Sequence, residues 1–311
     1  MALTLGVHAS NPSLYHLSRL PHLLDQELAP LGETGVWHRY TDGTRTGALL
    51  ADGTLDFGGT GSTPPVTAQA DGHDIVYTAV SAPRPGHGAL LVAAAGPVHR
   101  VADLKGTTVV LGIGSWQTHL LAKALDRAGL SYRDDITAQR PNDSARHPAE
   151  RLRSGEIGGW IAQEADLAAA LRSGDFRVLL PTAEVITDRS VFFARRDLAE
   201  QRPEVVAAIA AALQRADDWA AAHPREAAEA VAADLGGSAD DWETAHRLLP
   251  WRLEPVSDAF LAEQQEAADI LHAVGFTARP IRTADASVDA LRAPVAAALE
   301  RVAASRTGRE G

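Results

Sequence analysis

The chain has 311 residues, 45% of them hydrophobic, which is enough for two lobes that each bury a core. Its formal net charge of −11 argues against nucleic-acid binding, because a phosphate backbone requires a basic surface. The chain has no cysteine, which excludes disulfides, thiolate metal sites and a cysteine nucleophile.

Strand and helix patterns alternate over the first two thirds of the chain. This alternation is typical of α/β lobes in which a mostly parallel sheet is flanked by helices. The predicted strands are Leu3–Val7, Leu55–Phe57, Ile75–Ala79, Gly88–Val92, Thr108–Gly112, Gly159–Ile161, Arg177–Leu180 and Ser190–Ala194. The predicted helices are Pro12–Leu20, Val66–Ala70, Gln117–Ala128, Ala149–Arg153 and Glu164–Leu171.

The last third of the chain is predicted to be helical. Pro203 suits a first helical turn, and Val205, Ile209 and Leu213 then recur at helical spacing. Further helices are predicted at Pro224–Leu235, Asp240–Leu249, Ser257–Val274 and Val288–Ala304, and the end, Ser305–Gly311, is expected to be a frayed tail.

The N-terminus bears on where the protein works. A secretory signal would combine a basic start, an apolar stretch and a cleavage site, whereas Met1 leads directly into the predicted strand Leu3–Val7. We expect either a cytoplasmic chain or a periplasmic one in which Met1 replaces a removed export signal. No membrane span is expected, because no run approaches about 20 apolar residues.

Three times, a predicted strand runs into a short polar turn that opens a helix. The turns are His8–Asn11, Thr60–Thr63 and Gly114–Thr118. Such turns present backbone N–H groups and the positive end of a helix dipole, which favour an anion. Ligands of open α/β sheets bind at the carboxyl ends of strands, where these turns lie, so we expect the turns to share one anion site. The alternative for each turn is simple helix capping.

The candidate ligand-binding residues come from these turns and from one later strand. Hydroxyl groups of Thr60 and Ser115 are expected to donate to an anion, and the side chains of Trp116 and Trp160 to contact its organic part, with core packing the alternative for the tryptophans. The full candidate set is Ser10, Asn11, Thr60, Gly61, Ser62, Gly114, Ser115, Trp116, Gln117, Thr118 and Trp160.

The 12 histidines show no zinc-type spacing, so neither a metal nor a cofactor is expected. His8 ends the first strand and would be the candidate general base of an enzyme, with His38 the second candidate. Arg39, Arg45 and Arg84 are possible anion partners, but solvated surface positions are the favoured interpretation.

The chain resembles the substrate-binding proteins of ABC transporters for aliphatic sulfonates, taurine and nitrate. The resemblance rests on Asp52–Gly61 followed by Pro64-Pro65, on Ala102–Gly106 with Gly114-Ser115, on Gly155–Trp160 and on Arg202-Pro203-Glu204. Gly159 stands where an aspartate usually precedes the tryptophan.

This resemblance implies a two-lobed fold of the type II periplasmic-binding-protein kind, with extra C-terminal helices. Lobe one would comprise residues 1–85 and 188–311, and residues 86–187 would form an inserted lobe two. It also implies reversible binding of a small organic anion by hinge closure, an ABC permease as partner and a monomeric state.

A second, more distant resemblance is to the aromatic sulfinate desulfinases, which share this fold and act in the cytosol. It rests on Gly114-Ser115-Trp116 and on His38 upstream of Phe57-Gly58-Gly59. The nucleophilic cysteine of that family has no counterpart, and Asp56 replaces its arginine. A desulfinase-like enzyme, or another small-molecule lyase or hydrolase using His8, is therefore the alternative function.

Overall fold

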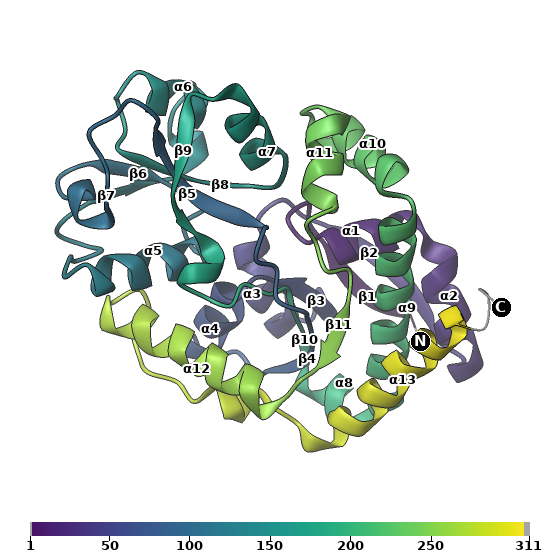
Figure 1. Ribbon diagram of the computed structural model, residues 1–311. Coiled ribbons are helices and arrows are strands. Elements are labelled where there is room, and N and C mark those ends of the chain that lie inside the picture. Colours follow the sequence, from purple (N-terminus) through teal and green to yellow (C-terminus); the bar gives the residue numbers. More distant parts are fainter. Residues whose placement is uncertain (1, 308–311) are drawn as a thin grey trace.

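The computed structural model describes residues 2–307 of the chain, which form two lobes around two separate β-sheets. Figure 1 shows lobe two at the upper left and lobe one below it and to the right. Two segments join the lobes, one between strands β4 and β5 and one between β9 and β10. The two-lobed α/β prediction is confirmed.

Lobe one contains a six-stranded sheet in the order β11-β4-β10-β3-β1-β2. Its strands are β1 (Ala2–Val7), β2 (Thr34–Arg39), β3 (Phe57–Thr60), β4 (Ile75–Ser81), β10 (Val191–Arg195) and β11 (Leu253–Pro255). Helices α1 (Pro12–Arg19), α2 (Pro21–Leu28), α9 (Pro203–Ala222) and α13 (Asp289–Thr307) cover one face. The other face is covered by α3 (Thr46–Ala51), α4 (Thr63–Ala70) and α12 (Asp258–Ala273).

Lobe two contains a five-stranded sheet in the order β7-β6-β8-β5-β9. Its strands are β5 (Gly88–Ala93), β6 (Thr108–Val110), β7 (Thr137–Gln139), β8 (Gly159–Gln163) and β9 (Phe176–Pro181). Helix α5 (Trp116–Arg127) packs on one face, and α6 (Pro148–Arg153) and α7 (Glu164–Ser173) pack on the other. The lobe bounds given above remain a prediction.

Both sheets are mixed, and most strands of each sheet run in one direction, as expected. In lobe one, β10 runs antiparallel to both β3 and β4, and β11 runs antiparallel to β4. In lobe two, β5 is antiparallel to both of its neighbours. The physical reason is that β5 and β10 adjoin the segments between the lobes, so each enters its sheet from the side of the other lobe.

The predicted strand at Leu55–Phe57 lies two residues further along, at Phe57–Thr60. Gly58 and Gly59, which lie between the predicted strand and the predicted turn, both belong to β3. A Cβ on Gly58 would lie 2.6 Å from Thr46 Cγ2, and one on Gly59 would lie 2.6 Å from the Phe192 ring. These glycines therefore allow neighbours to pack directly against the strand.

The sequence patterns missed short or polar elements. These are strands β2, β7 and β11 and helices α2, α3 and α8 (Arg196–Gln201). Strand β2 is at the sheet edge and only partly covered, so it lacks an apolar run, and β7 and β11 have three residues each. Helix α13 continues to Thr307, so the start of the predicted tail is helical, and residues 308–311 lie outside the described part.

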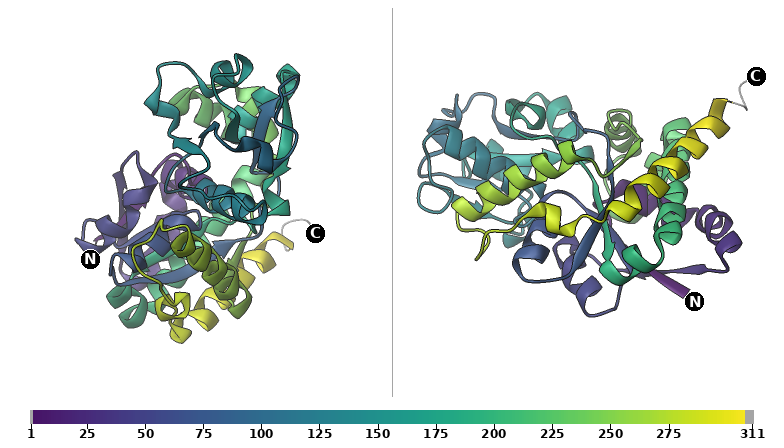
Figure 2. Two further views of the ribbon diagram at one scale, coloured as in Figure 1. Left: turned by 90° about the vertical axis from the view of Figure 1, so that its left-hand side faces the viewer. Right: turned by 90° about the horizontal axis from the view of Figure 1, so that it is seen from below.

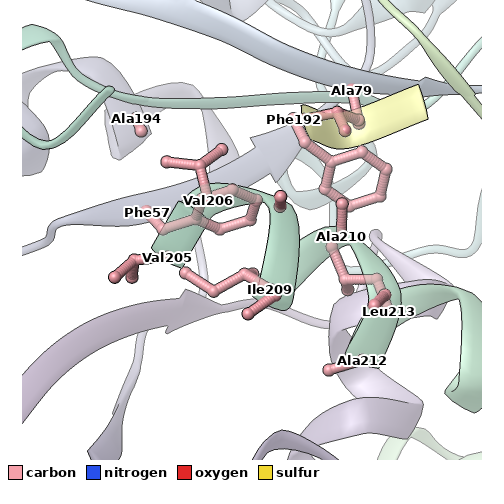
Figure 3. Packing of buried hydrophobic residues seen from close by; sticks show 14 of the residues in the cluster. Phe57, Ala79, Phe192, Ala194, Val205, Val206, Ile209, Ala210, Ala212 and Leu213 are labelled. Atoms are coloured by element: carbon pink, nitrogen blue, oxygen red, sulfur yellow. The ribbon is translucent and has the colours of Figure 1, made fainter. Parts of the chain in front are cut away.

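The core of lobe one is built around helix α9. Its apolar side chains, including Val206, Ile209 and Leu213, are fully buried against Phe57 and Phe192 of the sheet (Figure 3). Along β10 the side chains alternate between the two faces: Phe192 joins the α9 side and Phe193 the α3–α4 side. None of the helices in residues 2–307 combines the length and apolar character needed to cross a membrane.

The C-terminal helices contact both lobes. Helix α11 (Ala239–His246) lies against α7 of lobe two, where Arg172 forms an ion pair with Asp241, and α10 (Pro224–Leu235) packs on α11. On the other side α12 lies beside α5 (Figure 2), and Lys123 Nζ is 2.5 Å from Glu266 Oε1. The lobes are thus linked on two sides as well as through their connecting segments.

Two glycines allow the lobes to touch directly. Gly61 of lobe one lies under Trp116 of lobe two, where an added Cβ would be 3.1 Å from the tryptophan side chain. Gly114 of lobe two has φ +92°, and a Cβ there would lie 2.9 Å from Thr44 Cγ2 of lobe one. The closed arrangement therefore requires a small residue at position 114 for both its backbone conformation and its space.

The core packing predicts the effect of truncating helix α9. We expect Leu213→Ala to lower the free energy of unfolding by about 2–5 kcal/mol, because Leu213 is fully buried and its removal leaves a cavity. Leu235→Ala on α10 is the matched control, since Leu235 is 44% exposed and its loss should change stability by about 0.5 kcal/mol or less. Urea unfolding followed by circular dichroism measures both, and equal losses would contradict this packing.

The contact between the lobes predicts that Gly114→Ala is more damaging than an ordinary left-handed glycine substitution. Gly129→Ala is the control, because Gly129 has φ +71° with nothing within 4 Å, so only the backbone penalty of about 1–2 kcal/mol applies. Thr44→Ser removes the methyl group that opposes position 114. It should therefore restore the part of the stability loss of Gly114→Ala that exceeds the backbone penalty, and it should not change the stability of Gly129→Ala. An unfolding midpoint that Thr44→Ser fails to restore would argue against this contact.

Candidate functional site

A cavity of about 170 Å³ lies between the two lobes and is lined by residues from both. Lobe one and the connecting segment contribute His8, Ser10, Thr41, Asp42, Gly43, Thr44, Thr60, Gly61, Pro64 and Arg84. Lobe two contributes Gly112, Ile113, Ser115, Trp116, Arg140 and Gln163. The three turns that the sequence singled out therefore meet at one cavity.

Larger grooves exist on the outside of each lobe. One of about 740 Å³ is lined only by lobe two, around residues 93–98 and 152–158, and one of about 570 Å³ only by lobe one, around residues 69–75 and 279–285. Neither groove receives residues from both lobes or from the three turns. The smaller interlobe cavity is the better candidate because closure of the lobes would change it directly.

Six of the predicted site residues line the cavity: His8, Ser10, Thr60, Gly61, Ser115 and Trp116. The Ser115 hydroxyl caps α5, accepting a hydrogen bond from the Gln117 N–H at 3.2 Å and donating to the Gly112 carbonyl at 2.7 Å. The Thr60 hydroxyl donates to the Gly61 carbonyl at 2.9 Å. Both hydroxyls are thus already bonded within their turns, and each can turn its proton towards a ligand.

Five predicted residues support the turns from behind. Asn11 caps α1 by accepting from the Leu14 N–H at 3.1 Å. Gln117 Oε1 accepts from the Gly112 N–H at 2.6 Å, and Thr118 Oγ1 accepts from the Gly114 N–H at 2.8 Å. Ser62 Oγ lies 3.3 Å from His119 Nδ1, which joins α4 to α5 across the lobes. These side chains stabilise the three turns that face the cavity.

Two predicted residues lie away from the cavity. Trp160 is 3% exposed and packs edge-to-face with Phe176 inside lobe two. Its position on β8 explains this, because alternate residues of a strand face opposite sides of the sheet. His38 lies on the edge strand β2, with its ring centroid 6.1 Å from that of Tyr40.

His8 is the buried histidine of the cavity wall. Its Nε2 lies 2.8 Å from the Gly59 carbonyl, which can only accept, so Nε2 carries the proton. Burial lowers the pKa of His8 and keeps the ring neutral, so Nδ1 accepts from the Ser10 hydroxyl at 2.9 Å. Both ring nitrogens therefore already have partners within the protein.

The sequence missed the charged residues of the cavity. Arg84 was expected at the surface, but it is 3% exposed and lies 2.9 Å from Asp188 Oδ2, because the two connecting segments pack together. Arg140, Asp42 and Gln163 were not singled out at all, and all three line the cavity. No local motif marks them, except that prolines on both sides of Arg84 indicate an extended segment.

Four charged groups form a buried cluster at the base of the cavity: Arg84, His87, Glu164 and Asp188. Burial by itself would raise the pKa of Asp188, but Arg84 and His87 outweigh it and lower the pKa to about 2. Burial would also raise the pKa of Glu164, and His87 reverses that direction. For His87, burial and Arg84 oppose the charged ring, yet the two carboxylates prevail and raise its pKa.

The arrangement is suited to an anion rather than a metal. The N-terminus of the 12-residue helix α5 faces the cavity through Ser115 and Trp116, and the guanidinium groups of Arg84 and Arg140 lie in its wall. Among residues 2–307, no three His, Cys, Asp or Glu side chains are placed to hold a metal ion.

Comparisons with known proteins agree with this geometry. An Escherichia coli (strain K12) protein assigned to aliphatic sulfonate binding is 31% identical over 239 residues, covering 76% of this chain and 73% of that protein. The crystal structure of the periplasmic aliphatic sulphonate binding protein SsuA from Escherichia coli matches with a TM-score of 0.82 and 27% identity, covering 91% of each chain.

Two further structures are similar. The alkanesulfonate-binding protein SsuA from Xanthomonas axonopodis pv. citri, bound to MOPS, has a TM-score of 0.77 at 25% identity and covers 92% of this chain and 98% of its own. The desulfurization enzyme DSZB has a TM-score of 0.65 at 18% identity, covers 96% of this chain and 99% of its own, and shares the fold. The profile described as NMT1/THI5 like matches residues 38–227, and the chain belongs to the NMT1/THI5-like family.

Proposed function

We propose that this protein reversibly binds a small organic sulfonate in the interlobe cavity, as the substrate-binding component of an ABC-type importer. The observation that carries the proposal is the cavity itself, to which both lobes contribute residues of the three predicted turns. The relative assigned to aliphatic sulfonate binding, which is 31% identical, supports the same ligand class.

The cavity offers the groups that a sulfonate needs. The three sulfonate oxygens would accept hydrogen bonds from the hydroxyls of Thr60 and Ser115 and from backbone N–H groups at the start of α5. Arg84 and Arg140 would supply positive charge. Trp116 would contact the organic part. A cavity of about 150 Å³ is filled by benzene, so the cavity of about 170 Å³ suits about six to eight heavy atoms, as in a short alkanesulfonate.

Ligand capture would follow from rotation of the lobes about the connecting segments. The segments are hydrogen-bonded to each other, from Ser81 N–H to the Ser190 carbonyl at 2.8 Å and from Arg84 N–H to the Asp188 carbonyl at 2.9 Å. The cavity is enclosed where Trp116 meets Gly61 and Thr44 meets Gly114. Opening would separate these pairs and release the ligand, and we propose that a monomer performs this cycle for an ABC permease.

One observation favours the enzymatic alternative. His8 is a neutral imidazole in the cavity wall, hydrogen-bonded to the Ser10 hydroxyl, and a neutral imidazole can act as a general base. The other ring nitrogen donates to the Gly59 carbonyl, which fixes the orientation of the ring. Against the desulfinase chemistry, the chain has no cysteine to serve as the nucleophile.

A thermal-shift screen with sulfonates, sulfinates, nitrate and carboxylates, followed by product analysis of every hit, distinguishes the two functions. A binder is stabilised by its ligand according to ligand concentration and Kd, and leaves the ligand unchanged. Turnover of a stabilising compound would instead establish the enzyme. Stabilisation by none of the sulfonates would contradict the proposal.

Removal of a positive charge from the cavity should weaken binding without harming the fold. We expect Arg140→Gln to raise the Kd for ethanesulfonate at least about tenfold, a change of about 1.4 kcal/mol, because a positive charge is lost from the cavity. The fold should tolerate the change because Arg140 is exposed. Arg100→Gln is the control, since Arg100 is an exposed arginine of the same lobe outside the cavity. Calorimetry measures both, and an unchanged Kd for Arg140→Gln would remove this residue from the site.

A further inference from the structure

The buried cluster at the base of the cavity joins both connecting segments to lobe two. Arg84 and His87 lie on the segment between β4 and β5, Asp188 lies on the returning segment, and Glu164 begins α7. Arg84 is bound to Asp188 at 2.9 Å and to the Ser190 hydroxyl at 3.1 Å. The cluster therefore lies where the lobes turn relative to each other.

His87 lies between the two carboxylates of this cluster. Its Nδ1 is 2.9 Å from Asp188 Oδ2, its Nε2 is 3.6 Å from Glu164 Oε1, and its side chain is 1% exposed. A neutral imidazole has one N–H, so one of its lone pairs would face a carboxylate oxygen. Two carboxylates at these distances favour the doubly protonated, positively charged ring.

The cluster is connected to the ligand cavity at two points. Arg84 itself lines the cavity, and so does Gln163, which donates from Nε2 to Glu164 Oε2 at 3.2 Å. Gln163 Oε1 accepts from the Trp116 indole N–H at 3.2 Å and from Gln117 Nε2 at 2.8 Å. Glu164 has φ +50°, a strained conformation that occurs at functional sites when the surroundings enforce it.

We infer that the positive charge of His87 determines the affinity of the cavity for anions, so that anion binding is coupled to proton uptake at this hinge histidine. With His87 protonated, Arg84 and His87 balance Asp188 and Glu164. Without that proton, the cluster carries one net negative charge directly behind the anion. The inference rests on the proposed function and adds to it a specificity-determining residue that does not itself line the cavity.

The direction of the pH dependence follows from this balance. Burial opposes the charged ring of His87, but the two carboxylates raise its pKa, so the ring keeps its proton to higher pH than an ordinary histidine. Anion affinity should therefore be greatest while His87 is protonated and should fall as the pH rises through the raised pKa. By linkage, a bound anion raises the pKa of His87 further, so binding at alkaline pH takes up protons.

Other titratable groups around the cluster must be separated from His87. Asp217 of α9 is buried near Arg84, and burial raises its pKa to about 8, so it titrates in the same range. Burial lowers the pKa values of His8 and His246, and the charge of Glu164 opposes this lowering only in part. Burial also lowers the pKa of His119 to about 4, although Asp188 acts in the opposite direction. These three histidines are neutral throughout the alkaline range.

The experiment measures binding of ethanesulfonate and butanesulfonate to the full chain by calorimetry from pH 6.5 to 9.5. Repeats in buffers of different ionisation enthalpy give the number of protons exchanged. We expect affinity to fall about tenfold, equivalent to a one-unit shift in the pKa of His87 on binding, with net proton uptake at the alkaline end. Binding with a constant Kd and no proton exchange would overturn the inference while leaving the proposed function intact.

Four variants identify the residue that takes up the proton when the anion binds. His87→Gln should bind weakly at every pH and show no proton uptake, and Glu164→Gln should move the fall in affinity to lower pH because His87 loses one carboxylate. Asp217→Asn and the remote His73→Asn should keep the wild-type profile. Loss of the profile in Asp217→Asn would assign the proton to Asp217 and overturn the inference. If neither sulfonate binds the wild-type chain at any pH, both the proposed function and this inference are contradicted.

Discussion

The ion pair between Arg84 and Asp188 is the constraint on which the two-lobed structure depends. It joins the two segments that cross between the lobes, and both side chains are almost completely buried. Removal of one partner of such a pair leaves an uncompensated buried charge, which typically costs about 3–5 kcal/mol. The pair therefore fixes how the segments cross and at the same time keeps Arg84 in the wall of the interlobe cavity.

The rest of the site is arranged around this fixed crossing. Turns from lobe one approach it with His8 and Thr60, and the start of α5 approaches it from lobe two with Ser115 and Trp116. Helix capping and ligand binding are compatible uses of the same turn. Ser115 satisfies the Gln117 N–H and holds the Gly112 carbonyl, so the helix end is fixed in place while its dipole still faces the cavity.

The sequence predicted those parts of the site that are local in the chain. A strand, a polar turn and a capping residue follow one another directly, so the turns at Ser10, Thr60 and Ser115 were identifiable. Arg84 and Asp188 are 104 positions apart and meet only because the chain crosses between the lobes twice. The antiparallel direction of β10 has the same origin, and no local pattern in the sequence indicates it.

Orientation within an element was a second limit of the sequence. Trp160 and Gln163 both belong to β8, yet Trp160 is buried in the core of lobe two and Gln163 ends the strand at the cavity. A tryptophan is a more obvious candidate than a glutamine when only the sequence is known. Which of the two faces the cavity depends instead on the face of the strand and on the distance of the residue from the strand end. The amide of Gln163 then links Trp116 to Glu164, so the residue with the weaker sequence signal connects the cavity wall to the buried charged cluster.

His8 and His87 bear on how the site would capture an anion. His8 donates to the Gly59 carbonyl and accepts from Ser10, and His87 lies between two carboxylates. Each of these histidines is committed to holding a turn or a hinge in one arrangement. Groups fixed in this way can hold an anion and release it when the lobes separate, and reversible capture requires nothing more of them.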